Sequence, residues 1–214
     1  LYSINPFINP NIILRNEINP YDIQLGVKAR IGNNIKGGLS ANFIKVNNRA
    51  FFVTDTSLSS GNRFTLVYDS LNHTKIEANF SYQSGSKLNI NAIARYNSYE
   101  MRHELKAWNL PNFEFILGGV YNLYDKLIVK ADLHLGLNRF AKVYQPGPNV
   151  GTENNQYYYN LRGIIDGNLG VEYRYSKRLS GFMQINNVVA QRYLQFYNYP
   201  VMPIQVLAGI TFKF

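Results

Sequence analysis

The sequence predicts an all-β protein, a transmembrane antiparallel up-and-down β-barrel, and three observations support this fold class. Apolar and polar residues alternate over many segments. These segments run to about 9–12 residues, the length that a tilted strand needs to cross a bilayer, whereas soluble strands are commonly about 5–6 residues long. The connections alternate strictly between short and long, as in outer-membrane barrels. A soluble β-sandwich would share the alternation but not the other two features.

The composition agrees with this class. Of 214 residues, 46% are hydrophobic and 16% are charged, and there is no cysteine. No window approaches the roughly 18 consecutive apolar residues of a membrane helix. Averaging conceals alternating strands, so the mean hydropathy of −0.22 does not argue against a barrel. The 17 Tyr and 13 Phe suit the headgroup region of a bilayer.

The net charge is +9, and the basic residues are scattered singly at strand spacing. This pattern favours solvated charges in loops and in the lumen. Contact with anionic lipid headgroups or with an anionic solute is the alternative. The basic residues do not form the clustered patch of a nucleic-acid-binding protein, so no nucleic-acid partner is expected.

Nine strands are expected from the alternation and from the turn residues that bound it. They are 21–31, 36–54, 63–82, 88–98, 112–123, 127–139, 164–175, 178–190 and 203–214. Residues 1–20 contain three Asn-Pro steps and are expected to form an extended entry segment or external loop, because proline is unsuited to a central strand. Strand 63–82 is expected to rise above the membrane, with a break near Asn72.

The connections set the direction of each strand. Short turns are expected at 32–35, 83–86, 124–126 and 176–177, and long external loops near 47–63, 99–111, 139–160 and 190–202. If the last strand ends on the periplasmic side, the first of the nine enters from outside, whereas single-chain bacterial barrels usually have an even strand number. We therefore expect about nine to ten strands over 21–214, further strands before Leu1, and a chain that is the C-terminal part of a larger barrel.

Strand 203–214 has the clearest faces. Its apolar face holds Ile204, Val206, Ala208, Ile210, Phe212 and Phe214. The opposite face holds Gln205, Gly209, Thr211 and Lys213, with Leu207 as the exception. One face suits lipid and the other suits a wet lumen.

Four stretches share a family pattern: LGVEYRY at 169–175, LSGF at 179–182, QINN at 184–187 and LAGITFKF at 207–214. With the Tyr-rich loop before the last stretch, they resemble the C-terminal end of TonB-dependent receptor-like outer-membrane barrels. The resemblance implies the bacterial outer membrane, contact with its lipids, and a barrel assembly machinery that reads Ile210, Phe212 and Phe214 as an assembly signal. It also implies a TonB-type energy coupler and an outer-membrane protein as partners. A plug domain and a coupling box would lie before Leu1, and the alternative is a plugless relative of the family.

Charged residues of both signs are expected on the inward face of the strands. The lumen candidates for ligand binding are Arg95, Glu114, Lys130, Asp132, His134, Glu172 and Arg174. The functional interpretation is a solute path or a plug-docking surface, and the alternative is a structural network of paired charges.

Catalysis, metal binding and cofactors are not expected. No serine nucleophile motif accompanies His134. A zinc-binding HExxH motif beginning at His103 would need a second histidine where Ala107 stands.

The expected external loops carry aromatic residues. The candidates are Trp108, Tyr157, Tyr158, Tyr159, Phe196 and Tyr197. They suit an external aromatic girdle with packing between loops, or alternatively a surface for a ligand or a protein partner.

The resemblance implies a receptor or transporter that takes up a solute across the outer membrane of a Gram-negative bacterium. Two alternatives stay open. One is a structural or scaffolding barrel subunit of an outer-membrane complex, and the other is a passive pore.

Overall fold

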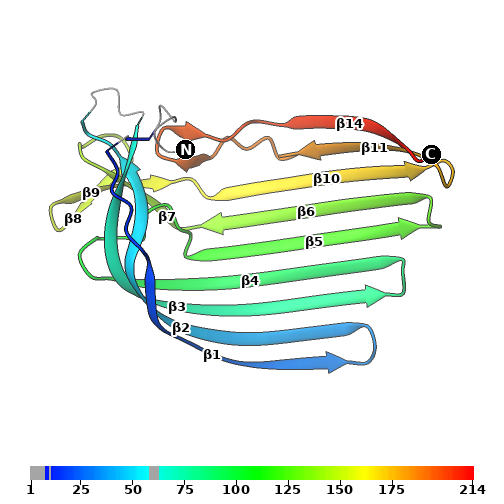
Figure 1. Ribbon diagram of the computed structural model, residues 1–214, viewed down its shortest axis with the longest axis horizontal. Coiled ribbons are helices and arrows are strands. Elements are labelled where there is room, and N and C mark those ends of the chain that lie inside the picture. The colour runs from blue at the N-terminus through cyan, green and yellow to red at the C-terminus, as the bar shows by residue number, and fades with distance from the viewer. Residues whose placement is uncertain (1–7, 10, 58–62) are drawn as a thin grey trace.

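The computed structural model describes residues 8–9, 11–57 and 63–214. All regular structure in these residues is β-structure (Figure 1). They include no helix long and apolar enough to cross a membrane. Residues 1–7 and 10 of the expected entry segment, and residues 58–62 of the first expected external loop, lie outside the described part.

Nine long strands form one antiparallel sheet in up-and-down order, which confirms the predicted fold class and the strand number. In sheet order they are β1 (Ile18–Ile31), β2 (Ile35–Thr54), β3 (Phe64–Ser84), β4 (Leu88–Met101), β5 (Phe113–Leu123), β6 (Leu127–Leu137), β10 (Ile164–Arg174), β11 (Leu179–Asn186) and β14 (Gln205–Phe212). Within the described residues, β1 and β14 are the two edges of this sheet and do not pair with each other.

The short and long connections lie at opposite edges of the sheet, as predicted (Figure 1). The short turns favour conformations with positive φ. Gly32 and Gly85 have φ of 60° and 53°, and Tyr124 and Asp125 have φ of 52° and 56°. Consecutive positive φ angles give a turn whose twist matches that of the flanking strands.

The expected break near Asn72 is wrong. Strand β3 runs through this residue, which pairs with Lys45 in regular register. The irregularity lies in the partner strand, where the register shifts between Val46 and Arg49 and Asn48 has a φ of 58°. This is a bulge in β2, and it changes the direction of the part of the β2–β3 hairpin that lies beyond the bulge.

Two of the long connections contain further strands. The connection between β6 and β10 holds β7 (Arg139–Val143), β8 (Val150–Glu153) and β9 (Gln156–Leu161), which form a separate three-stranded sheet. The connection between β11 and β14 holds β12 (Leu194–Phe196) and β13 (Tyr199–Pro200). The sequence pattern predicted only loops at 139–160 and 190–202.

The buried core lies at the end of the sheet that carries the long connections, and not in the middle of the sheet. It consists of Val46, Phe51, Val53, Leu71, Ala107 and Trp108. Strands β2 and β3 extend beyond their neighbours and supply most of it. We call this folded region the loop cap and define it as residues 46–57, 63–71, 99–112, 139–163 and 187–204.

The entry segment runs against the loop cap before β1 begins at Ile18. The backbone N–H of Asn9 donates to the carbonyl of Phe64. The hydroxyl of Tyr68 donates to the carbonyl of Ile13 and accepts from the N–H of Arg15. Strand β1 starts three residues earlier than the sequence pattern predicted.

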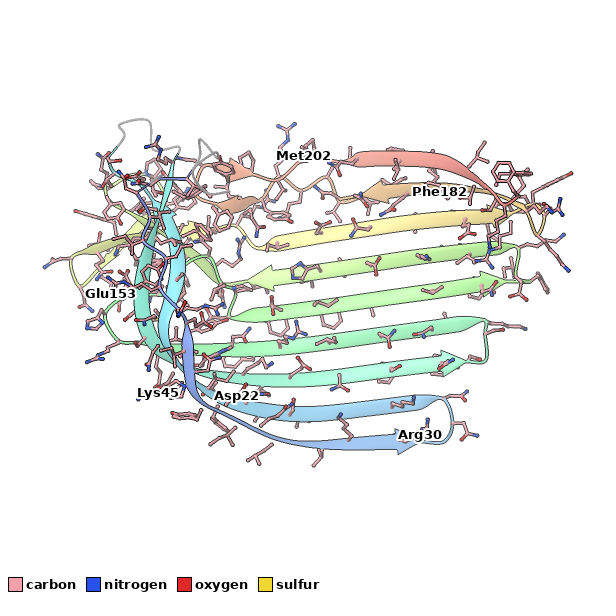
Figure 2. All side chains as sticks on the ribbon, viewed as in Figure 1. Asp22, Arg30, Lys45, Glu153, Phe182 and Met202 are labelled. Atoms are coloured by element: carbon pink, nitrogen blue, oxygen red, sulfur yellow. The ribbon has the colours of Figure 1, made fainter. Side chains whose placement is uncertain are left out.

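The strand register carries the two faces across the whole sheet. On one face, Leu25, Ala41, Ile76 and Tyr96 lie in one cross-strand row. On the other, Ser40, Glu77, Arg95 and Glu114 do so. Apolar side chains stand exposed on the first face, for example Val27 at 70%. We call it the outer face and its polar opposite the inner face. Figure 2 shows the side chains of both faces along the strands.

Candidate functional site: the inner face and the loop cap

All seven lumen candidates lie on the inner face. Those on one strand lie an even number of positions apart, and those on neighbouring strands are linked by direct cross-strand pairs and even spacings. Arg95 and Glu114 pair directly across β4 and β5. Asp132 and His134 lie opposite Gly118 and Ile116 of β5. Lys130 lies opposite Gly170, two residues along β10 from Glu172.

Arg95 is the centre of an ion-pair cluster near the loop cap. Its Nε donates to Glu77 Oε2 at 2.7 Å, and its Nη1 lies 3.7 Å from Glu114 Oε2. Glu77 was not among the candidates, although its spacing on β3 places it on the same face. The geometry fits a structural network of paired charges across three strands.

Lys130, Asp132 and His134 behave differently. Among the described residues, none of these side chains makes a hydrogen bond or an ion pair. The cross-strand neighbour of His134 is Asp166, whose Oδ2 accepts a hydrogen bond from the Tyr193 hydroxyl at 3.2 Å. Burial beside Asp166 raises the pKa of Tyr193. Residue 193 lies 27 positions from residue 166, so this contact had no local sequence signal.

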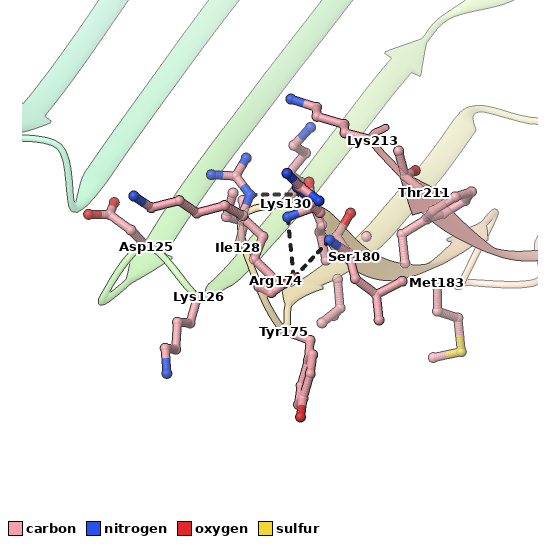
Figure 3. Close-up of a pocket in the computed structure, with 18 of the residues that line it drawn as sticks. Asp125, Lys126, Ile128, Lys130, Arg174, Tyr175, Ser180, Met183, Thr211 and Lys213 are labelled. Atoms are coloured by element: carbon pink, nitrogen blue, oxygen red, sulfur yellow. Dashed lines mark hydrogen bonds and ion pairs between the residues drawn. The ribbon is translucent and has the colours of Figure 1, made fainter.

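Lys130, Glu172 and Arg174 line a pocket of about 870 Å³ on the inner face near the short turns (Figure 3). Arg174 Nε donates to Glu172 Oε1 at 2.9 Å. Four further cationic residues line it: Lys126, Lys177, Arg178 and Lys213. Sequence reasoning did not select these four, because three of them lie in short turns rather than on strand faces.

Trp108 does not belong to an aromatic surface. It is 1% exposed and packs in the core of the loop cap. Its Nε1 donates to Glu104 Oε2 at 2.7 Å, and Lys142 Nζ lies 2.7 Å from the same oxygen. Burial corrects its role from a surface candidate to a core residue.

The other aromatic candidates pack against one another or against the cap. Tyr158 meets Phe140 with ring centroids 5.7 Å apart, and Tyr159 meets Tyr197 at 5.1 Å. Phe196 lies 5.7 Å from Phe52 and 5.3 Å from Phe64. The contacts of Tyr159 and Phe196 join connections that are distant in sequence, whereas Tyr158 and Phe140 pack β9 against β7 within one connection. These rings fix the shape of the cap.

Two buried charged groups also hold the cap together. Arg139 is 2% exposed and donates to the carbonyls of Asn109, Leu194 and Gln195. Burial lowers the pKa of its guanidinium. Asp69, 3% exposed, accepts from the N–H groups of Ser70, His103 and Glu104 and from His103 Nδ1.

The three residues expected to form an assembly signal are on or beyond the last strand. Ile210 pairs with Gly181 and Phe212 with Leu179, close to the short turn between β10 and β11. The rings of Phe212 and Phe214 meet edge-on at 5.3 Å. All three are highly exposed on the outer face, so they are available to a partner surface.

No cluster of three or more potential metal ligands occurs within residues 8–9, 11–57 and 63–214.

No family model matches the sequence, and no curated protein matches it. Solved structures do match. The pyoverdine outer-membrane receptor FpvA from Pseudomonas aeruginosa PAO1 is 17% identical with a TM-score of 0.66, over 90% of this chain and 29% of that one. The ferric-catecholate import receptor Fiu from E. coli K12 is 12% identical with a TM-score of 0.61, over 90% and 27%.

The siderophore receptor PiuA from Acinetobacter baumannii is 16% identical with a TM-score of 0.60, over 90% of this chain and 28% of that one. The chain thus spans under a third of the length of the receptors it matches. These likenesses concern the fold, and they confirm the resemblance and the barrel architecture predicted from the sequence. The chain has the barrel-wall fold of TonB-dependent outer-membrane receptors.

Proposed function

We propose that this chain forms the wall of an outer-membrane receptor that takes up a solute through the barrel interior. One observation carries the proposal: along the span that they share, the nine strands have an apolar outer face and a mostly polar inner face that carries charged residues of both signs. Lipid and a wet lumen are the two environments that such a sheet separates. The loop cap at one edge is a folded structure, which suits selective entry better than an open mouth.

The named ligands of similar receptors suggest the first solutes to test. FpvA is described with pyoverdine, and PiuA is described as a siderophore receptor. Metal chelates are therefore the first class of cargo to examine.

The test uses the full-length protein in a Gram-negative host. A deletion strain should lose uptake of at least one radiolabelled metal chelate, and a plasmid copy should restore it. An uncoupler should abolish the uptake if it is driven from the inner membrane. Normal uptake of every chelate, together with loss of a co-purifying outer-membrane complex, would favour the scaffolding role instead.

Planar-bilayer conductance separates the receptor from a passive pore. A receptor with a filled interior should give no stable open channel. A steady ohmic conductance from purified protein would favour the pore.

A further inference from the structure

The positive charge of the chain is concentrated at the short-turn edge of the sheet. In segments 29–37, 83–90, 121–130, 171–180 and 211–214, basic residues outnumber acidic ones by nine to two. The basic residues are Arg30, Lys36, Lys87, Lys126, Lys130, Arg174, Lys177, Arg178 and Lys213, and the acidic residues are Asp125 and Glu172. This edge therefore supplies most of the formal charge of +9.

Part of this charge faces the interior. Lys130, Arg174 and Lys213 come from three different segments and lie on the inner side, whereas Tyr175 points to the opposite side (Figure 3). With Lys177 and Arg178 they line the pocket of about 870 Å³. Its floor includes Gly170, Ser180 and Thr211, whose small size leaves room above the sheet.

The two acidic residues of the pocket, Asp125 and Glu172, offset only part of the charge of its six cationic residues. Glu172 is engaged by Arg174 at 2.9 Å. Asp125 Oδ1 accepts from Asn122 Nδ2 at 2.6 Å. Within the described chain, the Lys130 and Lys213 ammonium groups have no carboxylate partner. Like charges held together in a concave site raise the local concentration of anions.

The pocket lies on the inner face of the sheet, and this position limits which ligands can occupy it. Lipid headgroups meet the outer face and its exposed rings, such as Tyr173 at 51%. Lys130 lies one strand position away from the outer-face residues Val129 and Ala131, so the wall separates it from lipid. A water-soluble ligand within the lumen is the occupant that this geometry fits.

We propose that this pocket binds a small multivalent oxyanion, bearing phosphate or carboxylate groups, at the short-turn mouth of the barrel. The inference rests on the proposed function, because it requires the inner face to line the lumen. Glu172 orients the Arg174 guanidinium, whose planar fork suits two oxygens of one anion. Lys130 and Lys213 supply compact charges beside it.

The test is titration calorimetry on the purified full-length protein, with inorganic pyrophosphate and citrate as separate probes. The site variant is Lys130→Gln with Lys213→Gln. The matched control is Lys28→Gln with Lys36→Gln, which removes the same charge from the inner face of β1 and β2. We expect at least one probe to bind wild type. The site variant should weaken it by at least about tenfold, and the control by less than about twofold at about 0.15 M salt.

Three results would overturn the site. These are no binding of either probe to correctly folded protein, an equal loss in both double variants, or tight binding of an oligoglutamate peptide that neither small probe displaces. The last would assign the pocket to an acidic protein segment. A heat-dependent shift in gel mobility reports whether the protein has folded into a barrel. It therefore separates a failure of the oxyanion site from a failure of the proposed function. A folded barrel without probe binding overturns the oxyanion site alone, whereas failure to form a barrel overturns both.

Discussion

Arg139 Nη2 donates a 2.6 Å hydrogen bond to the carbonyl oxygen of Gln195, 56 positions further along the chain. The same guanidinium reaches the carbonyls of Asn109 and Leu194. One buried side chain thus joins three connections of the loop cap.

Replacing Arg139 with Met should loosen the loop cap while leaving the sheet folded. Three carbonyls would lose their donor, and the cost should be about 2 kcal/mol in the local free energy of opening. Trp108, the only tryptophan, lies in the cap core and reports opening by a red shift of its emission. Arg162→Met is the matched control, because Arg162 is exposed and makes no hydrogen bond in the described structure. Identical denaturation curves for both variants would contradict the role of Arg139 in joining the three connections.

Asp69 should make the cap sensitive to acid. Burial raises its pKa, but hydrogen bonds from Glu104, His103 and Ser70 outweigh it, so the pKa lies below the ordinary 3.8. A lowered folded pKa contributes stability that is present above the unfolded value and is lost as pH falls through the folded value. Cap stability should therefore hold above about pH 4 and decline below it.

Protease cleavage within 102–110, measured against pH, checks this expectation. Asp69→Asn should cleave faster at neutral pH and lose the acid-dependent part of the curve. Asp125→Asn, in an exposed turn, is the control and should follow wild type. A wild-type cleavage rate that does not change between about pH 6 and about pH 3, on either side of the ordinary Asp pKa of 3.8, would rule out the role of Asp69.

The sheet was predictable from sequence and the cap was not, for a physical reason. Along the span that the nine strands share, each strand face meets one environment, so period-2 alternation placed Arg95 and His134 on the same side. Strands β7, β8, β9 and β12 have three to six residues and depend on contacts such as Tyr159–Tyr197 that span distant connections. The sequence pattern predicted a break near Asn72 in β3, whereas the irregularity is the bulge at Asn48 in β2, which the sequence did not indicate.

Outer-face and inner-face substitutions should differ sharply at mid-strand. Leu117 lies near the middle of β5 on the outer face, and its neighbour Ile116 lies on the inner face opposite His134. Leu117→Arg should destabilise the barrel by about 2–4 kcal/mol in a lipid-vesicle folding assay, and Ile116→Arg by clearly less. Ile210→Arg should cost only about 0–1 kcal/mol, because Ile210 lies near the short turns. Equal effects at residues 116 and 117 would contradict the assignment of the two faces.

The Arg95 cluster should show unequal coupling to its two carboxylates. Arg95 Nε is hydrogen-bonded to Glu77 at 2.7 Å, whereas Glu114 lies beyond hydrogen-bond range at 3.7 Å. Double-mutant cycles with Arg95→Met should give a coupling energy of about 1 kcal/mol with Glu77→Gln and about half of that with Glu114→Gln. The exposed pair Arg174–Glu172, 2.9 Å apart on one strand, is the control and should couple by close to zero. Because Arg95 separates two carboxylates, Arg95→Met alone should also cost more than either glutamate substitution. Equal coupling in all three cycles would mean that these charges act through the net field of the lumen and not through the direct contacts that join β3, β4 and β5.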